Sequence, residues 1–340
     1  MQRILIVNVN WRGDVLFSIP FIRNLRDNFP ESYIASLIPK RCSEILQDCP
    51  YLNEIIYFNE RTTHRGLWKK IKFIVELRKK RFDMAILLHR SLSRTMICYL
   101  AGIKQRIGYY SRKRGWLLTK AISPLPKDSL HRIDYHLGIL KGMGLKVSSG
   151  SYEFFLNDDQ RGSLAEKLKG LGLRLTEQLV VLHPGANEPI RRWPVESFAR
   201  LAEKISAEFG LKVVISGSQA DIPIGRRIVE LSSVQLINLC GKTSLKELAA
   251  LFEKALFVVG GDTGPIHIAA AVGVPVICLF GTASVKITRP MGKGRSIILH
   301  KDIGCAIPCL RIDCADNRCM KAIGVDEVFQ AVGRVVNEGK

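Results

Sequence analysis

The residue with the clearest potential for acid–base chemistry is Asp14, in the segment N-V-N-W-R-G-D-V-L that begins at Asn8. An apolar run, Ile4–Val7, precedes the segment, and a helical pattern, Val15–Asn28, follows it. In one interpretation Asp14 is only the N-cap of that helix, worth about 1 kcal/mol. In the other, a carboxylate at the carboxyl end of a strand acts as a general base. Gly13 is expected to allow a tight turn, and no G-x-G-x-x-G dinucleotide fingerprint is present.

A second segment, L-H-P-G-A-N-E-P-I-R-R-W-P, runs from Leu182 to Pro194. A strand is expected to end at His183, and Asn187 lies in the Gly/Pro-containing loop that follows. Arg191 and Arg192 then form either a solvated surface pair or a pyrophosphate-binding pair, because a guanidinium grips phosphate oxygens well. The residues alone leave both interpretations open.

The third segment, V-V-G-G-D-T-G-P-I-H, is the strongest candidate for anion binding. A buried strand leads directly into a helix, whose first N–H groups, at Thr263 and Gly264, are available to an anion. Asp262 would repel that anion unless its carboxylate binds a neutral group such as a sugar hydroxyl. His267 is either a satisfied core histidine or a ligand-binding residue.

Four of the nine cysteines lie close together near the end of the sequence, at Cys305, Cys309, Cys314 and Cys319. Their spacing matches neither paired zinc knuckles nor a ferredoxin-type run. We therefore favour a loop of free thiols over a metal site.

The elements that must position these residues follow a βαβ rhythm, which predicts parallel sheets. This alternation of strands and helices occurs twice and predicts two doubly wound α/β domains, residues 1–160 and 161–340. Ligands are expected at the carboxyl ends of the strands, where both domains face a common cleft. A last helix, Val325–Asn337, is assigned to the second domain. It packs either within that domain or back on the first one. The expected strands are Ile4–Val7, Tyr33–Ile38, Glu54–Tyr57, Met84–Leu88, Leu179–His183, Lys212–Ser216, Leu236–Leu239, Leu256–Gly260 and Val276–Phe280.

The 340-residue chain is strongly basic, with 51 Lys and Arg against 31 Asp and Glu, a net charge of +20. Residues 1–160 hold 27 basic and 14 acidic side chains, a net +13, and the remainder holds 24 and 17, a net +7. Such a surface attracts nucleic acid, anionic lipid or phosphorylated substrates. The sequence shows no export signal, and its longest apolar region is interrupted by polar residues and prolines. With an odd number of cysteines, these features predict a cytoplasmic protein.

Taken together, the motifs resemble those of the family-nine glycosyltransferases, the ADP-heptose:lipopolysaccharide heptosyltransferases. The resemblance covers nearly the whole chain and rests on five motifs that occur in the family's order. They are G-D-V-L, H-P-G-A-N with R-R-W-P, S-G-S-x-x-D, L-C-G-K-T-S-L, and G-D-T-G-P-I-H-I-A-A-A-V-G-V-P-V-I-C-L-F-G.

The resemblance implies a GT-B fold, in which an N-terminal acceptor domain and a C-terminal nucleotide-sugar domain flank a cleft. It also implies inverting transfer of heptose from ADP-heptose to the inner core of lipopolysaccharide, on its lipid A–Kdo/heptose portion. Asp14 matches the family's base, with Arg12 and Gly13 beside it toward the acceptor, and Arg191 falls where a phosphate-binding lysine is common. The matching donor-side positions are His183, Asn187, Arg192, Ser216, Asp221, Asp262, Thr263, Gly264 and His267.

Two departures bear on the acceptor. Phe17 stands where many first-step heptosyltransferases have histidine, so the second-step type, heptosyltransferase II, is the better match. Arg191 keeps the charge of lysine but changes its geometry to a planar fork. No D-x-D motif is present, so we expect neither a metal nor another cofactor. The basic N-terminal half fits peripheral association with the anionic inner leaflet, at the cytoplasmic face of the inner membrane.

Two alternatives remain on the sequence alone. The first is another GT-B sugar-nucleotide enzyme, a non-heptose transferase or an epimerase. The second is a nucleic-acid-binding module, suggested only by the charge; no nucleic-acid-binding motif supports it, and we expect no nucleic-acid partner.

Overall fold

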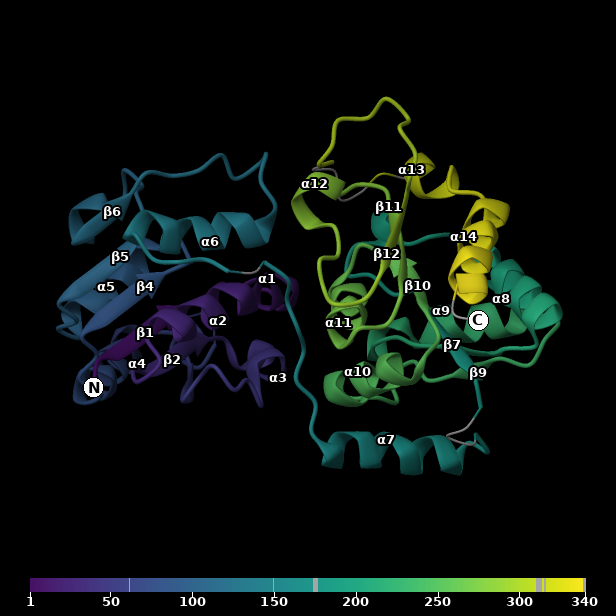
Figure 1. Ribbon diagram of the computed structural model, residues 1–340, viewed down its shortest axis with the longest axis horizontal. Helices are drawn as coiled ribbons and strands as arrows, with labels where there is room; N and C mark the ends of the chain where they lie inside the picture. Colours follow the sequence, from purple (N-terminus) through teal and green to yellow (C-terminus); the bar gives the residue numbers. More distant parts are fainter. Residues whose placement is uncertain (61, 149, 174–176, 310–313, 315, 339–340) are drawn as a thin grey trace. The chain divides into compact units, whose positions relative to one another are not determined.

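The computed structural model describes residues 1–340 apart from 61, 149, 174–176, 310–313, 315 and 339–340 (Figure 1). The chain divides into two compact units, Met1–Phe155 and Leu156–Lys340. Each contains one six-stranded sheet with helices packed on it.

The sheet of the first unit is parallel throughout, with the strand order β3-β2-β1-β4-β5-β6. This is the order of a doubly wound Rossmann-like sheet, in which the chain reverses direction of winding between β1 and β4. The strands are β1 (Arg3–Val7), β2 (Tyr33–Ile38), β3 (Glu54–Tyr57), β4 (Met84–Leu87), β5 (Gln105–Tyr109) and β6 (Lys120–Ile122).

Both faces of this sheet are covered, which is why its central strands are continuously apolar. On one face, Leu5 and Val7 of β1 pack with Phe73 and Leu77 of α4 and with Ile97 of α5. Helices α1, α2 and α6, which contact one another, lie on the opposite face (Figure 1). The helices are α1 (Arg12–Phe17), α2 (Ile19–Asn28), α3 (Ser43–Leu46), α4 (Leu67–Lys79), α5 (Leu92–Leu100) and α6 (Arg132–Met143), with short 3₁₀ turns η1 (Lys40–Cys42) and η2 (Gly115–Leu117).

The helical pattern Val15–Asn28 forms two helices rather than one, and it begins earlier than predicted, at Arg12. The break lies at Ser18, two residues before Pro20, which has no N–H to continue the helical hydrogen bonds. The Ser18 hydroxyl donates to the Val15 carbonyl at 2.6 Å and accepts from the Asn8 amide at 2.8 Å. The break therefore ties the start of α2 to the end of β1.

The second unit repeats the same topology, with the parallel order β12-β11-β10-β7-β8-β9. Its winding reverses between β7 and β10. The strands are β7 (Leu179–His183), β8 (Lys212–Ile215), β9 (Ile237–Asn238), β10 (Val258–Gly261), β11 (Val276–Phe280) and β12 (Ser296–His300). The helices are α7 (Asp158–Gly170), α8 (Val195–Phe209), α9 (Ile222–Leu231), α10 (Leu245–Lys254), α11 (Gly264–Val272), α12 (Val285–Thr288), α13 (Arg318–Lys321) and α14 (Val325–Glu338), with 3₁₀ turns η3 (Pro189–Arg191) and η4 (Gln219–Asp221).

The terminal helix α14 packs within this second unit. Its buried residues, Val328, Val332 and Val335, belong to the same core as Phe198 and Leu201 of α8. Helix α14 therefore buries its apolar face in the core of the second unit.

Candidate functional site

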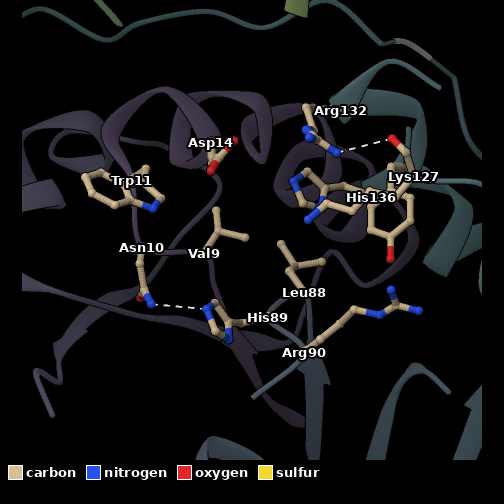
Figure 2. A pocket seen from close by; sticks show the side chains of 11 residues that line it. Val9, Asn10, Trp11, Asp14, Leu88, His89, Arg90, Lys127, Arg132 and His136 are labelled. Atoms are coloured by element: carbon tan, nitrogen blue, oxygen red, sulfur yellow. Dashed lines mark hydrogen bonds between the residues drawn. The ribbon is translucent and has the colours of Figure 1, made fainter. Parts of the chain in front are cut away.

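The first unit has a pocket of about 380 Å³ at the point where its winding reverses (Figure 2). In doubly wound sheets this is where ligands bind, because the loops after the two central strands separate there. The loop after β1 contributes Val9, Asn10 and Trp11, and the loop after β4 contributes Leu88, His89 and Arg90. The lining is completed by Asp14, Lys127, Arg132, Tyr135 and His136.

Asp14 lines this pocket, but it is not an N-cap. Helix α1 begins at Arg12 after the N-cap residue Trp11, so Asp14 is the third residue of the first turn. There the carboxylate interacts favourably with the helix dipole, which is worth about 0.3–1 kcal/mol at a surface site. Gly13 also lies inside this turn, and it is absent from the glycines with positive φ, so the predicted tight turn is wrong. Arg12 is exposed and donates from Nε to the Arg41 carbonyl at 3.1 Å.

Of the residues that line this pocket, three uncharged side chains present buried polar atoms with no hydrogen-bond partner in the described part of the chain. They are Tyr135 at its hydroxyl, His136 at both ring nitrogens and His89 at Nδ1. Burial lowers the pKa of His136 to about 3, and burial with the nearby Arg94 and Arg114 lowers the pKa of His89 to about 4, so both rings are neutral. Because buried polar groups normally have partners, these atoms are unused hydrogen-bonding groups in the wall of the pocket.

Basic side chains surround the same pocket. Arg90, Lys127 and Arg132 line it directly, and Arg132 donates to the Lys127 carbonyl at 3.2 Å (Figure 2). Behind it, buried Arg94 donates to the Asn8 carbonyl at 2.8 Å, and buried Arg114 donates to the His89 carbonyl at 2.9 Å. These guanidinium groups fix the loops after β1 and β4.

The neutral state of His136 predicts how stability depends on pH. The unfolded imidazole has a pKa of 6.5 and the folded one about 3, so the unfolded chain binds more protons below pH 6.5. Stability conferred by this group is therefore present above pH 6.5 and lost progressively as the pH falls. We expect His136→Phe to flatten the pH dependence of urea unfolding between pH 6.5 and 4.5 by up to about 1.4 kcal/mol per pH unit. Equal slopes for the two proteins would contradict the burial of a neutral ring.

The second unit gathers polar residues at its own reversal point, between β7 and β10. Asp262, directly after β10, accepts from Thr288 Oγ1 at 3.2 Å and lies 3.0 Å from His267 Nε2. Arg191, in the turn η3 after β7, lies 3.8 Å from the same carboxylate and 2.6 Å from Glu188. His267 thus has a carboxylate partner, and the structure brings Arg191, Asp262 and His267 together.

Thr263 and Gly264 form the start of α11 beside this cluster. Thr263 is the N-cap residue, yet its side chain makes no cap hydrogen bond, and its buried hydroxyl has no partner among the described residues. The space around Gly264 is open where a side chain would begin. By contrast, a Cβ on Gly261 would lie 2.7 Å from the Arg191 carbonyl, so this glycine lets η3 approach β10 closely. The helix start is therefore open to an anion and adjacent to a guanidinium.

Most of the remaining donor-side candidates make hydrogen bonds within the loops of the second unit. His183 is buried, with a pKa that burial lowers to about 4, and its Nδ1 lies 2.9 Å from Ser216 Oγ. Asp221 accepts from the Ser218 backbone and hydroxyl at 2.9 and 2.6 Å. Arg192 donates twice to the Ala186 carbonyl, at 2.7 and 3.0 Å. These contacts fix the loops after β7 and β8, whereas Asn187 is exposed.

The cysteine-rich segment gives no metal centre among the described residues, where no group of three or more His, Cys, Asp or Glu has suitable geometry. Cys305, Cys309, Cys314 and Cys319 are all free thiols. Within the same described part of the chain, no helix combines the length and the apolar character that crossing a bilayer requires.

Solved structures with the same architecture define the class of fold. A glycosyltransferase family 9 protein from Veillonella parvula aligns with a TM-score of 0.91 at 23% identity, covering 99% of this chain and 98% of that one. Escherichia coli ADP-heptose lps heptosyltransferase II aligns with a TM-score of 0.82 at 22% identity, covering 100% and 99%. The fold is GT-B, built from two Rossmann-like units.

Sequence comparison then gives the family. Lipopolysaccharide heptosyltransferase 2 of E. coli K12 is 27% identical over 318 residues, which cover 87% of this chain and 88% of that protein. Lipooligosaccharide heptosyltransferase 2 of Haemophilus influenzae is 28% identical over 308 residues, covering 87% and 88%. Residues 70–319 match glycosyltransferase family 9 (heptosyltransferase). The chain belongs to this family and is a glycosyltransferase, which disfavours the epimerase and the nucleic-acid-binding module.

Proposed function

We propose that the protein transfers heptose from ADP-heptose to the inner core of lipopolysaccharide, as a transferase of the heptosyltransferase II type. The observation that carries the proposal is the pocket around Asp14: a carboxylate, neutral hydrogen-bonding groups and several cations converge at the reversal point of the first unit. An acceptor that is both polyhydroxylated and anionic fits that lining. The names of the relatives supply the sugar and the class of acceptor.

In the proposed reaction an acceptor hydroxyl attacks the anomeric carbon of the donor while Asp14 takes its proton. The new bond is a carbon–oxygen bond, and the bond from the anomeric carbon to the phosphate oxygen of ADP breaks. Its electron pair leaves with ADP, and the anomeric configuration inverts because there is a single displacement. One carboxylate is sufficient as base, since no covalent enzyme intermediate forms.

The second unit supplies the stabilisation of the leaving group. Arg191 and the free N–H groups at the start of α11 are suited to the negative charge that develops on the pyrophosphate. Asp262 would repel phosphate, so we assign its carboxylate to holding Arg191 and His267 and to accepting from a sugar hydroxyl. We assign His183, Ser216, Asp221 and Arg192 to positioning the loops that contact the donor, and Asn187 to a direct contact.

Donor turnover tests this proposal. Purified protein is incubated with deacylated inner-core acceptor and, in separate reactions, with ADP-heptose, UDP-sugars and GDP-sugars. We expect release of ADP with heptosylated product and no comparable turnover of the other donors. Preferred turnover of a UDP- or GDP-sugar would replace the heptose assignment with that of a non-heptose transferase.

We also propose that the enzyme works at the cytoplasmic face of the inner membrane as a peripheral protein. The acceptor is a glycolipid, so its sugars lie at a bilayer surface. The first unit is the more basic one: residues 1–155 hold 27 Lys and Arg against 12 Asp and Glu, a net +15. A charge of this size is attracted to anionic headgroups.

A further inference from the structure

Helix α4 has two apolar faces, although only one of them is needed for the fold. Phe73 and Leu77 are buried in the core of the first unit, 6% and 2% exposed. Leu67, Trp68 and Ile71 lie elsewhere around the helix and are 71%, 82% and 40% exposed. Val75, one turn beyond Ile71, is 49% exposed. Positions 67, 71 and 75 are four residues apart, so they line one stripe along the helix.

This second stripe is unusual for a surface helix. Isolated apolar side chains on a surface need no explanation, but clusters of them mark sites of interaction. Among the described residues, 13 of the 15 exposed large apolar side chains belong to the first unit, and four of these belong to α4. Helix α4 therefore holds more of these side chains than any other described helix or strand of the more basic unit.

The charges around the stripe select the kind of partner. Residues 65–79 contain six basic side chains, Arg65, Lys69, Lys70, Lys72, Arg78 and Lys79, and a single acidic one, Glu76. A helix with Trp and aliphatic residues on one face and Lys and Arg beside them is suited to the interface of an anionic bilayer. A second copy of the chain is a poorer fit, because a symmetric contact would place these like charges against one another.

The topology of the first sheet places the start of α4, which carries the most exposed residues of the stripe, at the same sheet edge as the pocket. All six strands of the first sheet are parallel, so their carboxyl ends lie at one edge of the sheet. Helix α4 is the element that follows β3, whose carboxyl end lies at that edge, and its first residues are Leu67 and Trp68. The pocket with Asp14 lies at the same edge, because the loops after β1 and β4 build it.

We propose that α4 docks the first unit on anionic lipid, with Leu67, Trp68, Ile71 and Val75 entering the interface and the neighbouring lysines and arginines contacting headgroups. The purpose of docking, bringing the pocket to the sugars of a membrane glycolipid, rests on the proposed function. The binding itself does not, because it depends only on the surface of α4.

The test is co-sedimentation of the full-length protein with vesicles that contain no acceptor, made of phosphatidylcholine alone or with phosphatidylglycerol. We expect binding to the phosphatidylglycerol vesicles, at least tenfold weaker binding to phosphatidylcholine alone, and further weakening with salt. Trp68→Ser with Ile71→Ser, and separately Lys69→Glu with Lys72→Glu, are each expected to weaken binding by about tenfold or more. Both double variants alter exposed side chains, so thermal unfolding should be almost unchanged.

A matched control is available at the end of α7 in the second unit. Leu171 is 44% exposed and Lys169 is also exposed, so Leu171→Ser with Lys169→Glu removes the same kinds of side chain from another surface. The control should bind vesicles as the unaltered protein does. Equal binding by the control and the α4 variants would overturn the docking proposal. A second result would also overturn it. Sedimentation velocity would show that the protein self-associates and that the α4 variants do not, while the same variants still bind vesicles normally.

Transfer to the deacylated acceptor separates this proposal from the proposed function. The α4 variants should transfer heptose to that soluble acceptor at the normal rate and should lose activity only on acceptor embedded in vesicles. An equal loss on both acceptors would count against docking as the role of α4. Absence of transfer by the unaltered protein would count against the proposed function, while the vesicle sedimentation would still decide the docking.

Discussion

Replacing Asp14 by asparagine is expected to lower the rate of heptose transfer at saturating substrates by about 10²–10⁴-fold, the usual cost of losing a general base. Asparagine keeps the shape of the side chain but cannot accept the proton. Stability should fall only slightly, by about 0.3–1 kcal/mol, because the carboxylate in the first turn of α1 also interacts with the helix dipole. The affinity for ADP should survive, since we assign the nucleotide to the other unit.

The first turn of α6 offers a matched control for this variant. Asp134 is the third residue of α6, as Asp14 is of α1, but it is exposed and does not line the pocket. Asp134→Asn should show a similar small change in melting temperature with normal transfer. If Asp14→Asn transferred heptose nearly as fast as this control, Asp14 would be reduced to a stabilising residue of α1. A large drop in melting temperature would also argue against the base, because the loss of activity would then be structural.

Arg191→Ala is expected to weaken ADP binding by tenfold or more. A hydrogen bond to a charged group contributes about 1.5–3 kcal/mol, and 1.4 kcal/mol corresponds to a factor of ten in affinity. The guanidinium lies beside Glu188 and Asp262, which hold it next to the start of α11. Isothermal titration calorimetry with ADP measures the effect directly.

Arg200→Ala is the matched control, because Arg200 is an exposed arginine of α8 in the same unit. It should bind ADP normally. Arg191→Lys should fall between the two, since an ammonium keeps the charge but loses the planar fork. Unchanged affinity in Arg191→Ala would assign this arginine to the ion pairs alone and remove it from the donor site.

The doubly wound fold could be predicted because its central strands are short, continuous apolar runs. Tyr33–Ile38, Leu179–His183 and Val276–Phe280 are strands with the bounds that the sequence indicates. The strands that the sequence does not indicate are the inner strand β5, whose first residues Gln105 and Arg106 are polar, and the edge strands β6 and β12. The strand β6 has only three residues, two of them exposed, and β12 is half-buried throughout, so neither shows a continuous apolar run.

Part of the candidate site was also accessible from the sequence. Asp14 and Asp262 closely follow strands β1 and β10, where chemistry is expected in this topology. The start of α1 was misplaced because Trp11 is not a usual N-cap residue. His89, Tyr135 and His136 were missed altogether.

These three residues come from two distant stretches of the chain, and only the fold brings them to one pocket. The available signal was His89, the second residue after the buried strand β4. For Tyr135 and His136, inside α6, the sequence gives only an ordinary helical pattern. Thr288, which donates to Asp262, was likewise outside every motif considered.

The most direct test of the proposed heptosyl transfer is mass spectrometry of the lipopolysaccharide core from cells that lack this protein. We predict a core truncated within its heptose region, restored by the unaltered gene and by Asp134→Asn but not by Asp14→Asn. A core of unchanged mass and sugar composition in the deletion strain would contradict the account.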